Sequence, residues 1–500
     1  MDTPLPPLIR SLLAPGRCPG FAGSAELVQT HISWVLLAGE FAYKIKKPVR
    51  LPFLDFSTLA LRRDRCEEEL RLNRRFAPDI YHDVVALYPP ADHPSWSGTD
   101  APIEYAVRMH RFDESGRLDH LCARGELRPA HLSDLAASLV QFHGRADVAP
   151  LASRFGRPTE VQAPALENFQ ELQQLLTDTP TQNRLALLRR WTEAEFHRLA
   201  PQFQERKATG YIRECHGDLH LANLVCIHGR VRMFDCIEFN EDLRWIDVAS
   251  DVAFTYVDLL DHGQGGLAGW FLNEALSQSG DYRAAVLLRF YAVYRAMVRM
   301  KVAAIRATQA PAGPAIDPLS YLGLAEQLAR PGPARLIVTH GLAGCGKTVA
   351  STQLLQTDRH AATVRLRSDV ERKRLFGLTP QAHSGSATGE GIYTPDAQAR
   401  TYAHLRAQAA MLLDAGWSVV VDAAFLRRDE RDSFRRLAQE RGVGWGILAP
   451  EATPAVLRER IIDRQRLGQD ASEATLQVLQ QQMAWLEPLR AREQGCVIAL

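Results

Sequence analysis

The sequence predicts an α+β fold for residues 1–306 and an α/β fold with a parallel sheet for residues 335–500. Three observations support this division. β-rich runs open the chain and helical periodicity follows them, which is typical of an α+β fold. Residues 307–334 are rich in Ala, Pro and Gly around one short helical pattern, as expected of a linker between domains. After the linker, a strand, a glycine-rich loop and a helix begin a regular alternation of strands and helices.

The composition is that of an ordinary globular chain. With 500 residues, 46% hydrophobic and 23% charged, about two to four domains are expected, each with its own core. A formal net charge of +1 argues against general attraction to nucleic acid or membrane. The eight cysteines form no C-x-x-C pair, which predicts buried thiols in a reducing compartment. Because neither a signal peptide nor an apolar run of about 20 residues is seen, we expect a soluble, cytoplasmic protein.

Residues 31–47 predict a β-hairpin, because two β-rich runs flank the turn signal A-G-E. Side chains alternate along a strand, so Lys44 and Lys46 share one face of the second run. Kinases use one lysine on such a strand to contact nucleotide phosphates, and A-Y-K-I makes Lys44 the candidate. The alternative is a solvated lysine on an edge strand. No G-x-G-x-x-G precedes Lys44, so a phosphate-covering loop is expected within Gln29–Ser33.

Helical spacing from Thr58 to Phe76 predicts a helix that carries an acidic partner for Lys44. The sequence does not choose among the three adjacent candidates, Glu67, Glu68 and Glu69. The alternative for such a run is a solvated face. Ile103–Met109 predicts a further strand, and the polar, turn-rich residues after it are expected to form a hinge that borders an adenine pocket.

The segment from His216 to Phe239 combines a polar loop with a hairpin, H-G-D-L-H-L-A-N-L-V-C-I-H-G-R-V-R-M-F-D-C-I-E-F. Phosphoryl transfer from ATP needs a carboxylate to orient the acceptor hydroxyl, and an amide oxygen and a second carboxylate to hold magnesium. The spacing matches the catalytic loop and the magnesium-binding hairpin of protein kinases. It predicts Asp218 as the catalytic residue and Asn223 and Asp235 as magnesium ligands. The alternative is that these residues cap turns and His216 is a packed core histidine.

Two acids follow in D-V-A-S-D, where Asp247 and Asp251 at i and i+4 predict one helical face. Acids on an apolar helix are costly to bury without partners. Asp247 is therefore expected to brace the catalytic loop by accepting its backbone N–H groups. His143, near the end of a helix predicted over 131–145, is expected to be a core or capping residue.

Residues from about 25 to 305 resemble the aminoglycoside phosphotransferase group of small-molecule kinases, which have a two-lobed, protein-kinase-like fold. H-G-D-L-H-L-A-N, F-D-C-I-E-F and D-V-A-S-D carry this resemblance. It implies that Asp218 is a catalytic base and that Asn223 and Asp235 bind magnesium. The group includes antibiotic, choline, homoserine and sugar kinases, so the resemblance does not specify the acceptor.

The second part begins with L-I-V-T-H-G-L-A-G-C-G-K-T-V-A, a strand, a phosphate-binding loop and the start of a helix. The loop fits G-x-x-x-x-G-K-[ST], whose backbone N–H groups cradle phosphates. Lys347 is expected to reach the β- and γ-phosphates and Thr348 to coordinate magnesium. The predicted nucleotide-binding residues are Gly341, Leu342, Ala343, Gly344, Cys345, Gly346, Lys347 and Thr348.

Two aspartates are expected beside this loop, because ligands bind beyond the carboxyl ends of parallel strands. Asp369 follows the strand Thr363–Leu366 and is predicted to be a general base to the acceptor, or alternatively a helix N-cap. Asp422 ends the buried strand W-S-V-V-V-D and is predicted to hold magnesium through water. Arg460 and Arg464, at i and i+4, are predicted to close over the transferring phosphate; a solvated helical face is the alternative.

Residues from about 335 to 490 resemble small P-loop kinases, a group that includes phage polynucleotide kinase, gluconate kinase and zeta-toxin-like enzymes. The phosphate loop, R-S-D-V-E-R-K-R-L, V-V-V-D-A-A-F and D-A-S-E-A carry this resemblance. It implies that Asp369 contacts the acceptor. The polar stretch Thr379–Tyr393 is expected to be a loop on the acceptor side.

The sequence thus predicts an ATP- and Mg²⁺-dependent phosphotransferase with two kinase modules. Each would transfer the γ-phosphate of ATP to a hydroxyl of a small molecule. The alternative is one active kinase and one ATP-binding regulatory sensor. A nucleic-acid-end kinase is disfavoured by the near-neutral charge and the lack of a basic, aromatic-interleaved stretch. The acceptors, any coupling between the modules and the oligomeric state do not follow from the sequence.

Overall fold

The computed structural model describes residues 4–51, 54–309, 317–380, 382–385, 390–467 and 471–499. It divides into two compact units, one of Met1–Glu160 with Phe203–Asp251 and one of Val161–Gln202 with Val252–Leu500. Of the linker predicted at 307–334, residues 310–316 lie outside the described part, and the remainder falls inside the second unit with helix α10 (Pro318–Ala329). The three-part division of the chain at this linker therefore stays a prediction.

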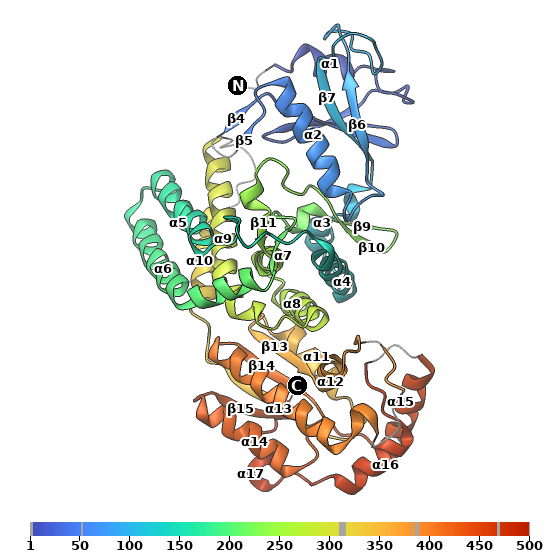
Figure 1. Cartoon of the computed structure of the whole chain (residues 1–500), viewed down its shortest axis with the longest axis vertical. Coiled ribbons are helices and arrows are strands. Elements are labelled where there is room, and N and C mark those ends of the chain that lie inside the picture. Colours follow the sequence, from blue (N-terminus) through green and yellow to red (C-terminus); the bar gives the residue numbers. More distant parts are fainter. Residues whose placement is uncertain are drawn as a thin grey trace. The chain divides into compact units, whose positions relative to one another are not determined.

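The first unit contains a five-stranded antiparallel sheet with the order β1-β2-β3-β7-β6 (Figure 1). Its strands are β1 (Glu26–Gln29), β2 (Ser33–Ala38), β3 (Phe41–Lys46), β6 (Tyr81–Leu87) and β7 (Glu104–His110). The predicted hairpin is present, because Ala38 pairs with Phe41 across a tight turn in which Gly39 has φ +59°. Glycine adopts this left-handed conformation without a steric penalty.

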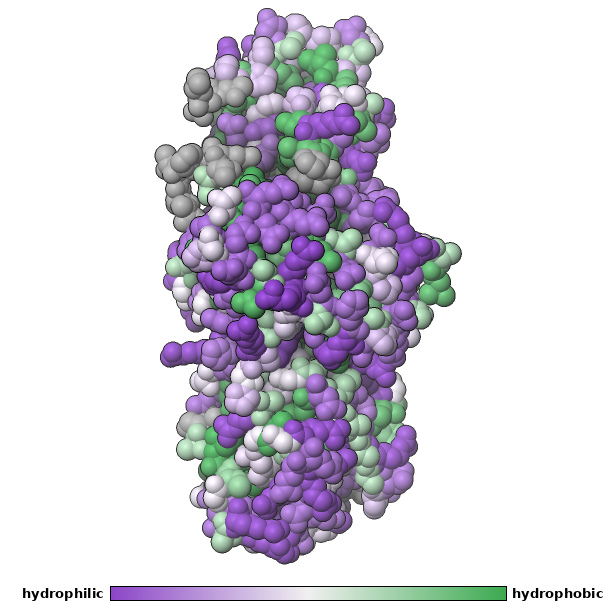
Figure 2. Space-filling model, turned by 90° about the vertical axis from the view of Figure 1, so that its left-hand side faces the viewer, coloured by the Kyte–Doolittle hydropathy of each residue, from purple (hydrophilic) through white to green (hydrophobic). Residues whose placement is uncertain are grey.

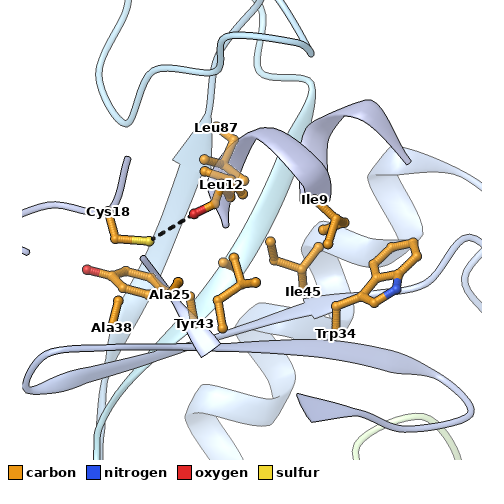
Figure 3. Packing of buried hydrophobic residues seen from close by; sticks show 11 residues of the cluster. Ile9, Leu12, Cys18, Ala25, Trp34, Ala38, Tyr43, Ile45 and Leu87 are labelled. Carbon is orange, nitrogen blue, oxygen red and sulfur yellow. Dashed lines mark hydrogen bonds between the residues drawn. The ribbon is translucent and has the colours of Figure 1, made fainter. Parts of the chain in front are cut away.

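One face of this sheet is covered by an apolar core that Figure 3 shows from close by. Ile9 and Leu12 of helix α1 (Pro7–Leu12) pack there with Tyr43 and Ile45 of β3. Because side chains alternate along a strand, Lys44 and Lys46 of β3 point to the opposite face. All four of these β3 side chains are buried, so the two lysines need acidic partners.

Helix α2 (Leu59–Asn73) supplies that partner. Thr58 begins the helix as its N-cap, accepting a hydrogen bond from the Leu61 N–H group. The helix packs on β6 and β7 through Cys66, which lies in a core with Tyr81 and Val107. Glu69, three residues after Cys66, is fully buried on the same side of the helix.

The remaining elements of the first unit form a scaffold for the polar loop 215–223. They include α3 (Leu118–Ala123), α4 (Pro129–Arg145), β8 (Ile212–Glu214), β9 (Leu224–Ile227), β10 (Arg230–Met233) and β11 (Trp245–Asp247). β9 and β10 form the predicted hairpin, with His228 and Gly229 at its turn, both at positive φ. β8 pairs with β11 in antiparallel fashion and so fixes the chain on both sides of the loop.

The second unit contains a helical part and a parallel sheet (Figure 1). Its helical part includes most of α5 (Pro158–Leu175), α6 (Thr179–Ala208) and α7 (Val248–Asp261), with α8 (Gly265–Ser279), α9 (Ala284–Gln309) and α10. An ion pair between Arg184 of α6 and Glu326 of α10 joins two of these helices. The short helix predicted within the linker is present as α10.

The parallel sheet has four strands in the order β13-β14-β12-β15. The strands are β12 (Arg335–Thr339), β13 (Thr363–Arg367), β14 (Ser418–Asp422) and β15 (Gly444–Leu448). The helices are α11 (Lys347–Thr357), α12 (Ser368–Leu375), α13 (Pro395–Asp414), α14 (Arg428–Glu440), α15 (Pro454–Leu467), α16 (Leu476–Trp485) and α17 (Ala491–Gln494). An α+β part followed by an α/β part with a parallel sheet is thus confirmed.

Two further expectations concern the cysteines and the surface. All eight cysteines are free thiols, but Cys226 and Cys496 are only partly buried, unlike the prediction. The face drawn in Figure 2 is mostly hydrophilic, with hydrophobic residues in small, dispersed groups. Within the described part of the chain, no helix combines the length and the apolar character needed to cross a membrane.

Candidate functional site

Lys44 lies between two carboxylates in the first unit. Its Nζ atom is 2.8 Å from Glu69 Oε1 and 2.5 Å from Asp235 Oδ1. Burial alone would lower the pKa of Lys44, but the charges of Asp235 and Glu69 outweigh burial and raise it. Of the three adjacent glutamates, the structure therefore pairs Glu69 with Lys44. Of the other two, Glu67 pairs with the half-exposed Arg63, and Glu68 pairs with Arg71 and with the buried Arg244.

The same glutamate also binds a second lysine, because Lys46 Nζ is 2.7 Å from Glu69 Oε2. Burial would raise the pKa of Glu69, but Lys44 and Lys46 lower it to about 2. Lys46 also pairs with Glu238. Sequence reasoning did not select Glu238, although it stands three residues after Asp235 in D-C-I-E and so offers a second acid to the shared lysine face.

The polar loop is held closed by Asn223. Its Nδ2 group donates to the carbonyl oxygen of Asp218 at 2.9 Å and to Asp218 Oδ2 at 3.2 Å. The side chain of Asp218 remains 37% exposed, so a bound molecule can reach its carboxylate. Phe234 N–H donates to the Asn223 carbonyl at 3.0 Å, which places Asp235 beside Asn223 at the end of the hairpin. The three residues predicted from the spacing are therefore brought together.

Asp235 has an unusual backbone conformation, with φ +62°. Non-glycine residues adopt this region rarely, and surrounding contacts must hold them there. The Tyr81 hydroxyl accepts the Asp235 N–H at 3.0 Å, and Asn73 Oδ1 accepts the N–H of Cys236 at 3.0 Å. Both acceptors come from the α2 and β6 region, and the sequence carried no local pattern that singled them out.

The brace of the loop is Asp251 and not Asp247, which corrects the sequence prediction. Asp251 accepts the N–H groups of His216 at 3.1 Å and Gly217 at 3.0 Å. Asp247 ends strand β11, and helix α7 begins only at Val248, so the two acids do not share a helical face. Instead Asp247 forms a bidentate pair with Arg206, at 2.5 and 2.7 Å.

His143 of α4 is buried and contacts Asp251, with Nε2 at 3.1 Å from Oδ2. Together with Cys215, these two side chains lie within reach of a common metal ion. Burial raises the pKa of the Cys215 thiol, and Asp251 already accepts two backbone N–H groups, so this cluster is better described as a support for the loop. His143 is thus the core residue that the sequence predicted.

A cavity of about 780 Å³ lies where the hinge was expected. It is bounded by the segment His110–Glu114 after β7, by Glu26 and Val28 of β1 and by the β2–β3 turn. The loop expected to cover phosphates, within Gln29–Ser33, is the short connection between β1 and β2. The assignment of this cavity to adenine stays a prediction.

In the second unit, the glycine-rich loop runs from the end of β12 to the start of α11. Gly341, Gly344 and Gly346 have φ of +141°, +83° and +105°, which glycine alone adopts readily. A Cβ atom at Gly344 would lie 2.9 Å from the Leu457 carbonyl oxygen of α15. Lys347 Nζ donates to the carbonyl groups of Gly341 and Leu342 at 2.9 and 2.8 Å, inside the curve of the loop.

One cavity of about 1230 Å³ contains most of the residues predicted for the second module. Its lining includes Ala343, Gly344, Cys345, Gly346, Lys347, Thr348, Asp369, Asp422, Arg460 and Arg464. Asp422 Oδ2 accepts a hydrogen bond from the Ser351 hydroxyl at 3.1 Å. Ser351 lies about one helical turn after Thr348 in α11. Arg460 donates to the Gly344 carbonyl at 3.1 Å, so helix α15 reaches the loop directly.

Asp369 is not the N-cap of helix α12, because Arg367 occupies that position. Its side chain is 31% exposed and lies 3.5 Å from Arg372. This removes the alternative that the sequence left open and keeps the carboxylate on the cavity wall. Of the expected acceptor-side loop Thr379–Tyr393, residues 381 and 386–389 lie outside the described part. Ser384 and Tyr393 both bond to Glu473, so that glutamate joins this loop to the segment before α16.

Both sites offer oxygen ligands of the kind that Mg²⁺ prefers. In the first they are the Asn223 amide and the Asp235 carboxylate, and in the second the Thr348 hydroxyl and the Asp422 carboxylate. The donor sets fit a magnesium ion bound mainly through phosphates and water.

Comparison with known proteins identifies the second module. Residues 336–489 match the family model described as an AAA domain. We refer to these residues as the AAA domain because of this match. Its match covers the P-loop, the parallel sheet and helices α11 to α16. Outside the AAA domain, no family assignment follows from this match.

Three mycobacterial proteins are similar over most of the chain, including the AAA domain. They are uncharacterized proteins of Mycobacterium bovis and of two strains of Mycobacterium tuberculosis. Each is 29% identical over 447 residues, which covers 89% of this chain and 88% of the relative. The similarity therefore extends along most of the length of each relative.

Solved structures with a weak likeness include a choline/ethanolamine kinase family protein from Mesorhizobium loti, with 12% identity and a TM-score of 0.39. It covers 71% of this chain and 96% of its own. An ethanolamine kinase of Plasmodium vivax has 9% identity and a TM-score of 0.38, covering 62% of this chain and 82% of its own. A choline kinase of Cryptosporidium parvum has 12% identity and a TM-score of 0.36, covering 61% and 87%.

Proposed function

We propose that this protein is an ATP- and Mg²⁺-dependent phosphotransferase with two kinase modules, each acting on a hydroxyl of a small molecule. The observation that carries the proposal is that each module gathers a lysine and acidic side chains at one site. In the first, Lys44 Nζ lies within 2.8 Å of both Glu69 and Asp235. In the second, Lys347, Asp369 and Asp422 line one cavity.

In the first module, each side chain has a distinct task. Glu69 holds the Lys44 ammonium so that it faces the phosphates, as a helix glutamate does in protein kinases. Asp218 orients the acceptor hydroxyl and takes its proton as the acceptor oxygen bonds to the γ-phosphorus. The bond from that phosphorus to the bridging oxygen breaks, and ADP is the leaving group. Asn223 and Asp235 would hold Mg²⁺, which neutralises charge on the phosphates when it is bound. Choline and ethanolamine kinases phosphorylate alcohols, so a small amino alcohol is one acceptor class to test here.

In the AAA domain, the loop N–H groups and Lys347 bind the β- and γ-phosphates. Asp369 stands on the acceptor side of the cavity and would accept the hydroxyl proton. Arg460 and Arg464 lie on α15 above the loop, where they can balance the charge that develops on the transferred group. Thr348 and Asp422 would hold Mg²⁺. No glutamate follows Asp422, so the acid pair of a motor ATPase is missing.

A second candidate function makes the AAA domain a nucleotide sensor that regulates the first module. The observation that favours it is the direct hydrogen bonding between helices α7 to α9 and this domain within the second unit. Under this alternative, the AAA domain binds nucleotide without producing a phosphorylated product of its own.

The test uses the full chain with radiolabelled ATP, Mg²⁺ and pooled metabolites that include amino alcohols and sugars. Asp218→Ala and Lys347→Ala are each expected to abolish a different labelled product. Asp242→Ala and Lys301→Ala, which alter charged residues outside both sites, serve as matched controls and should leave both products. If Lys347→Ala only changes the rate of the product that needs Asp218, the sensor function is correct. Absence of any labelled product would contradict both candidates.

A further inference from the structure

Strand β13 lies at the edge of the parallel sheet, where the backbone groups on one side have no strand to pair with among the described residues. Asn273 of helix α8 satisfies two of them. Its Nδ2 group donates to the Thr363 carbonyl at 2.9 Å, and its Oδ1 atom accepts the Arg365 N–H at 2.6 Å. The side chain is 2% exposed, so the pairing takes place in the interior of the unit. The amide thus completes the edge of β13 as a neighbouring strand would.

Helix α8 lies beside α11 and β13 of the AAA domain (Figure 1). A Cβ atom at Gly265 would lie 2.0 Å from the Arg359 carbonyl oxygen, and one at Gly266 would lie 2.0 Å from that of Gln356. Only glycine permits this approach of α8 to the end of α11. Helix α11 begins with Lys347, so α8 packs against the helix that carries the phosphate loop.

The residue that Asn273 fixes reaches back to the same helix. Arg365 is buried, and its Nη1 group donates to Thr352 Oγ1 at 2.8 Å and to Ser351 Oγ at 3.4 Å. The Ser351 oxygen accepts a hydrogen bond from Arg365. The proton of the Ser351 hydroxyl therefore points toward the two acceptors on the other side of this residue. These are Asp422 Oδ2 and the Thr348 carbonyl, both at 3.1 Å. Hydrogen bonds to the backbone and from the side chain of Arg365, and then from Ser351, therefore connect Asn273 to the carboxylate of Asp422.

We propose that Asn273, on a helix outside the AAA domain, is a positioning residue for the magnesium side of its P-loop. By fixing β13 at Arg365, it holds the guanidinium against α11, and Ser351 then keeps the Asp422 carboxylate oriented. The proposal rests on the proposed function of the second module, in which Asp422 holds Mg²⁺ beside Thr348. Residues that support a metal ligand commonly change metal affinity by about ten- to a hundredfold when they are removed.

The experiment measures binding of a non-hydrolysable ATP analogue to the full chain by calorimetry, at a series of Mg²⁺ concentrations. The part of the binding that Lys347→Ala removes belongs to the P-loop. For Asn273→Ala, the Mg²⁺ concentration that gives half of the maximal effect should rise about tenfold, whereas affinity without Mg²⁺ stays the same. Ser351→Ala should give the same rise, and the double variant no further rise, because both act through one chain of bonds.

Tyr256→Phe is the matched control, because the Tyr256 hydroxyl also bonds to the AAA domain, at 3.2 Å from the Ala361 carbonyl, but does not contact Arg365. It should leave the Mg²⁺ dependence unchanged. Should Asn273→Ala fail to fold, Thr352→Val removes the nearest acceptor of Arg365 and should raise the Mg²⁺ requirement by itself.

Three results would overturn the inference. One is an equal loss of affinity with and without Mg²⁺ in Asn273→Ala, which would mean that Asn273 only supports packing. Another is the same effect in Tyr256→Phe, or no effect in Thr352→Val. The third is that Lys347→Ala binds the ATP analogue with the same Mg²⁺ dependence as the wild type, so that none of the Mg²⁺-dependent binding belongs to the P-loop. That last result alone also contradicts the proposed function of the second module.

Discussion

The carboxylate of Asp251 accepts the backbone N–H group of Gly217 at 3.0 Å, directly before the proposed catalytic residue Asp218. His216 N–H and His143 Nε2 bind the same carboxylate. A loop that must orient an acceptor hydroxyl has to be held within a fraction of an ångström, and buried hydrogen bonds to a charged group are strong enough to hold it.

Asp251 should make the stability of the first unit depend on acid pH. Burial would raise the pKa of this carboxyl, but hydrogen bonds from His143 and Gly217 and the nearby imidazoles lower it from 3.8 to about 2. Since the folded pKa lies below the unfolded one, the carboxylate stabilises the fold above pH 4 and this stabilisation is lost as pH falls toward 2. Its size is about 2 kcal/mol, of which about 1 kcal/mol is lost between pH 6 and pH 3.

This pH dependence is measured by denaturant unfolding of the wild type and Asp251→Asn at both pH values. The difference between them in free energy of unfolding should shrink by about 1 kcal/mol at pH 3. A difference that stays constant would show that the Asp251 carboxyl does not titrate differently on folding.

Gly217→Ala should damage the catalytic loop. The backbone has φ +86° there, and a Cβ atom would lie 2.6 Å from the Leu243 carbonyl oxygen. We expect a loss of about 1 to 3 kcal/mol of stability, together with loss of the Asp218-dependent product. Gly229→Ala in the following hairpin is the control, since its φ is +74° but no atom lies within 4 Å of the added Cβ. Equal activity of the two variants would contradict this account.

Glu69→Gln should destabilise the first unit strongly, because one buried carboxylate neutralises both Lys44 and Lys46. Removing one partner of a buried ion pair costs about 3 to 5 kcal/mol. The neighbouring Glu67→Gln removes only a half-exposed pair with Arg63 and should cost less than about 1 kcal/mol. Thermal or denaturant unfolding separates the two variants, and similar stability of both would show that Glu69 is replaceable.

Arg460→Ala should slow phosphoryl transfer by the AAA domain while nucleotide still binds. An arginine that balances transition-state charge is worth about a thousandfold or more in rate. Arg458→Ala, on the same helix and exposed to solvent, should leave the rate unchanged. The measurement is single-turnover formation of the Lys347-dependent product. If Arg460→Ala abolishes nucleotide binding instead, its role is to hold the loop through the Gly344 carbonyl.

Much of the molecule could be predicted because its defining patterns are local. The P-loop needs glycines, a lysine and a hydroxyl within eight consecutive residues, and the polar loop keeps Asp218 and Asn223 only five residues apart. Helix α2 begins at a Thr cap, and the β2–β3 hairpin turns at a glycine, so short-range preferences set these boundaries. Local patterns of this kind do not depend on the rest of the fold.

The sequence by itself determined the two classes of fold, the glycine-rich P-loop and the shared face of Lys44 and Lys46 on strand β3. Only the tertiary structure decided that Glu69 faces Lys44, that Asp251 rather than Asp247 braces the loop, and that Asn273 completes β13. In each case the local sequence pattern did not distinguish among several polar residues. Which of them makes the contact depended on the face that its helix or strand presents to an element far away in the sequence. Burial then favours this one pairing strongly, because a charge or an amide without a partner in the interior lowers the free energy of unfolding by several kcal/mol.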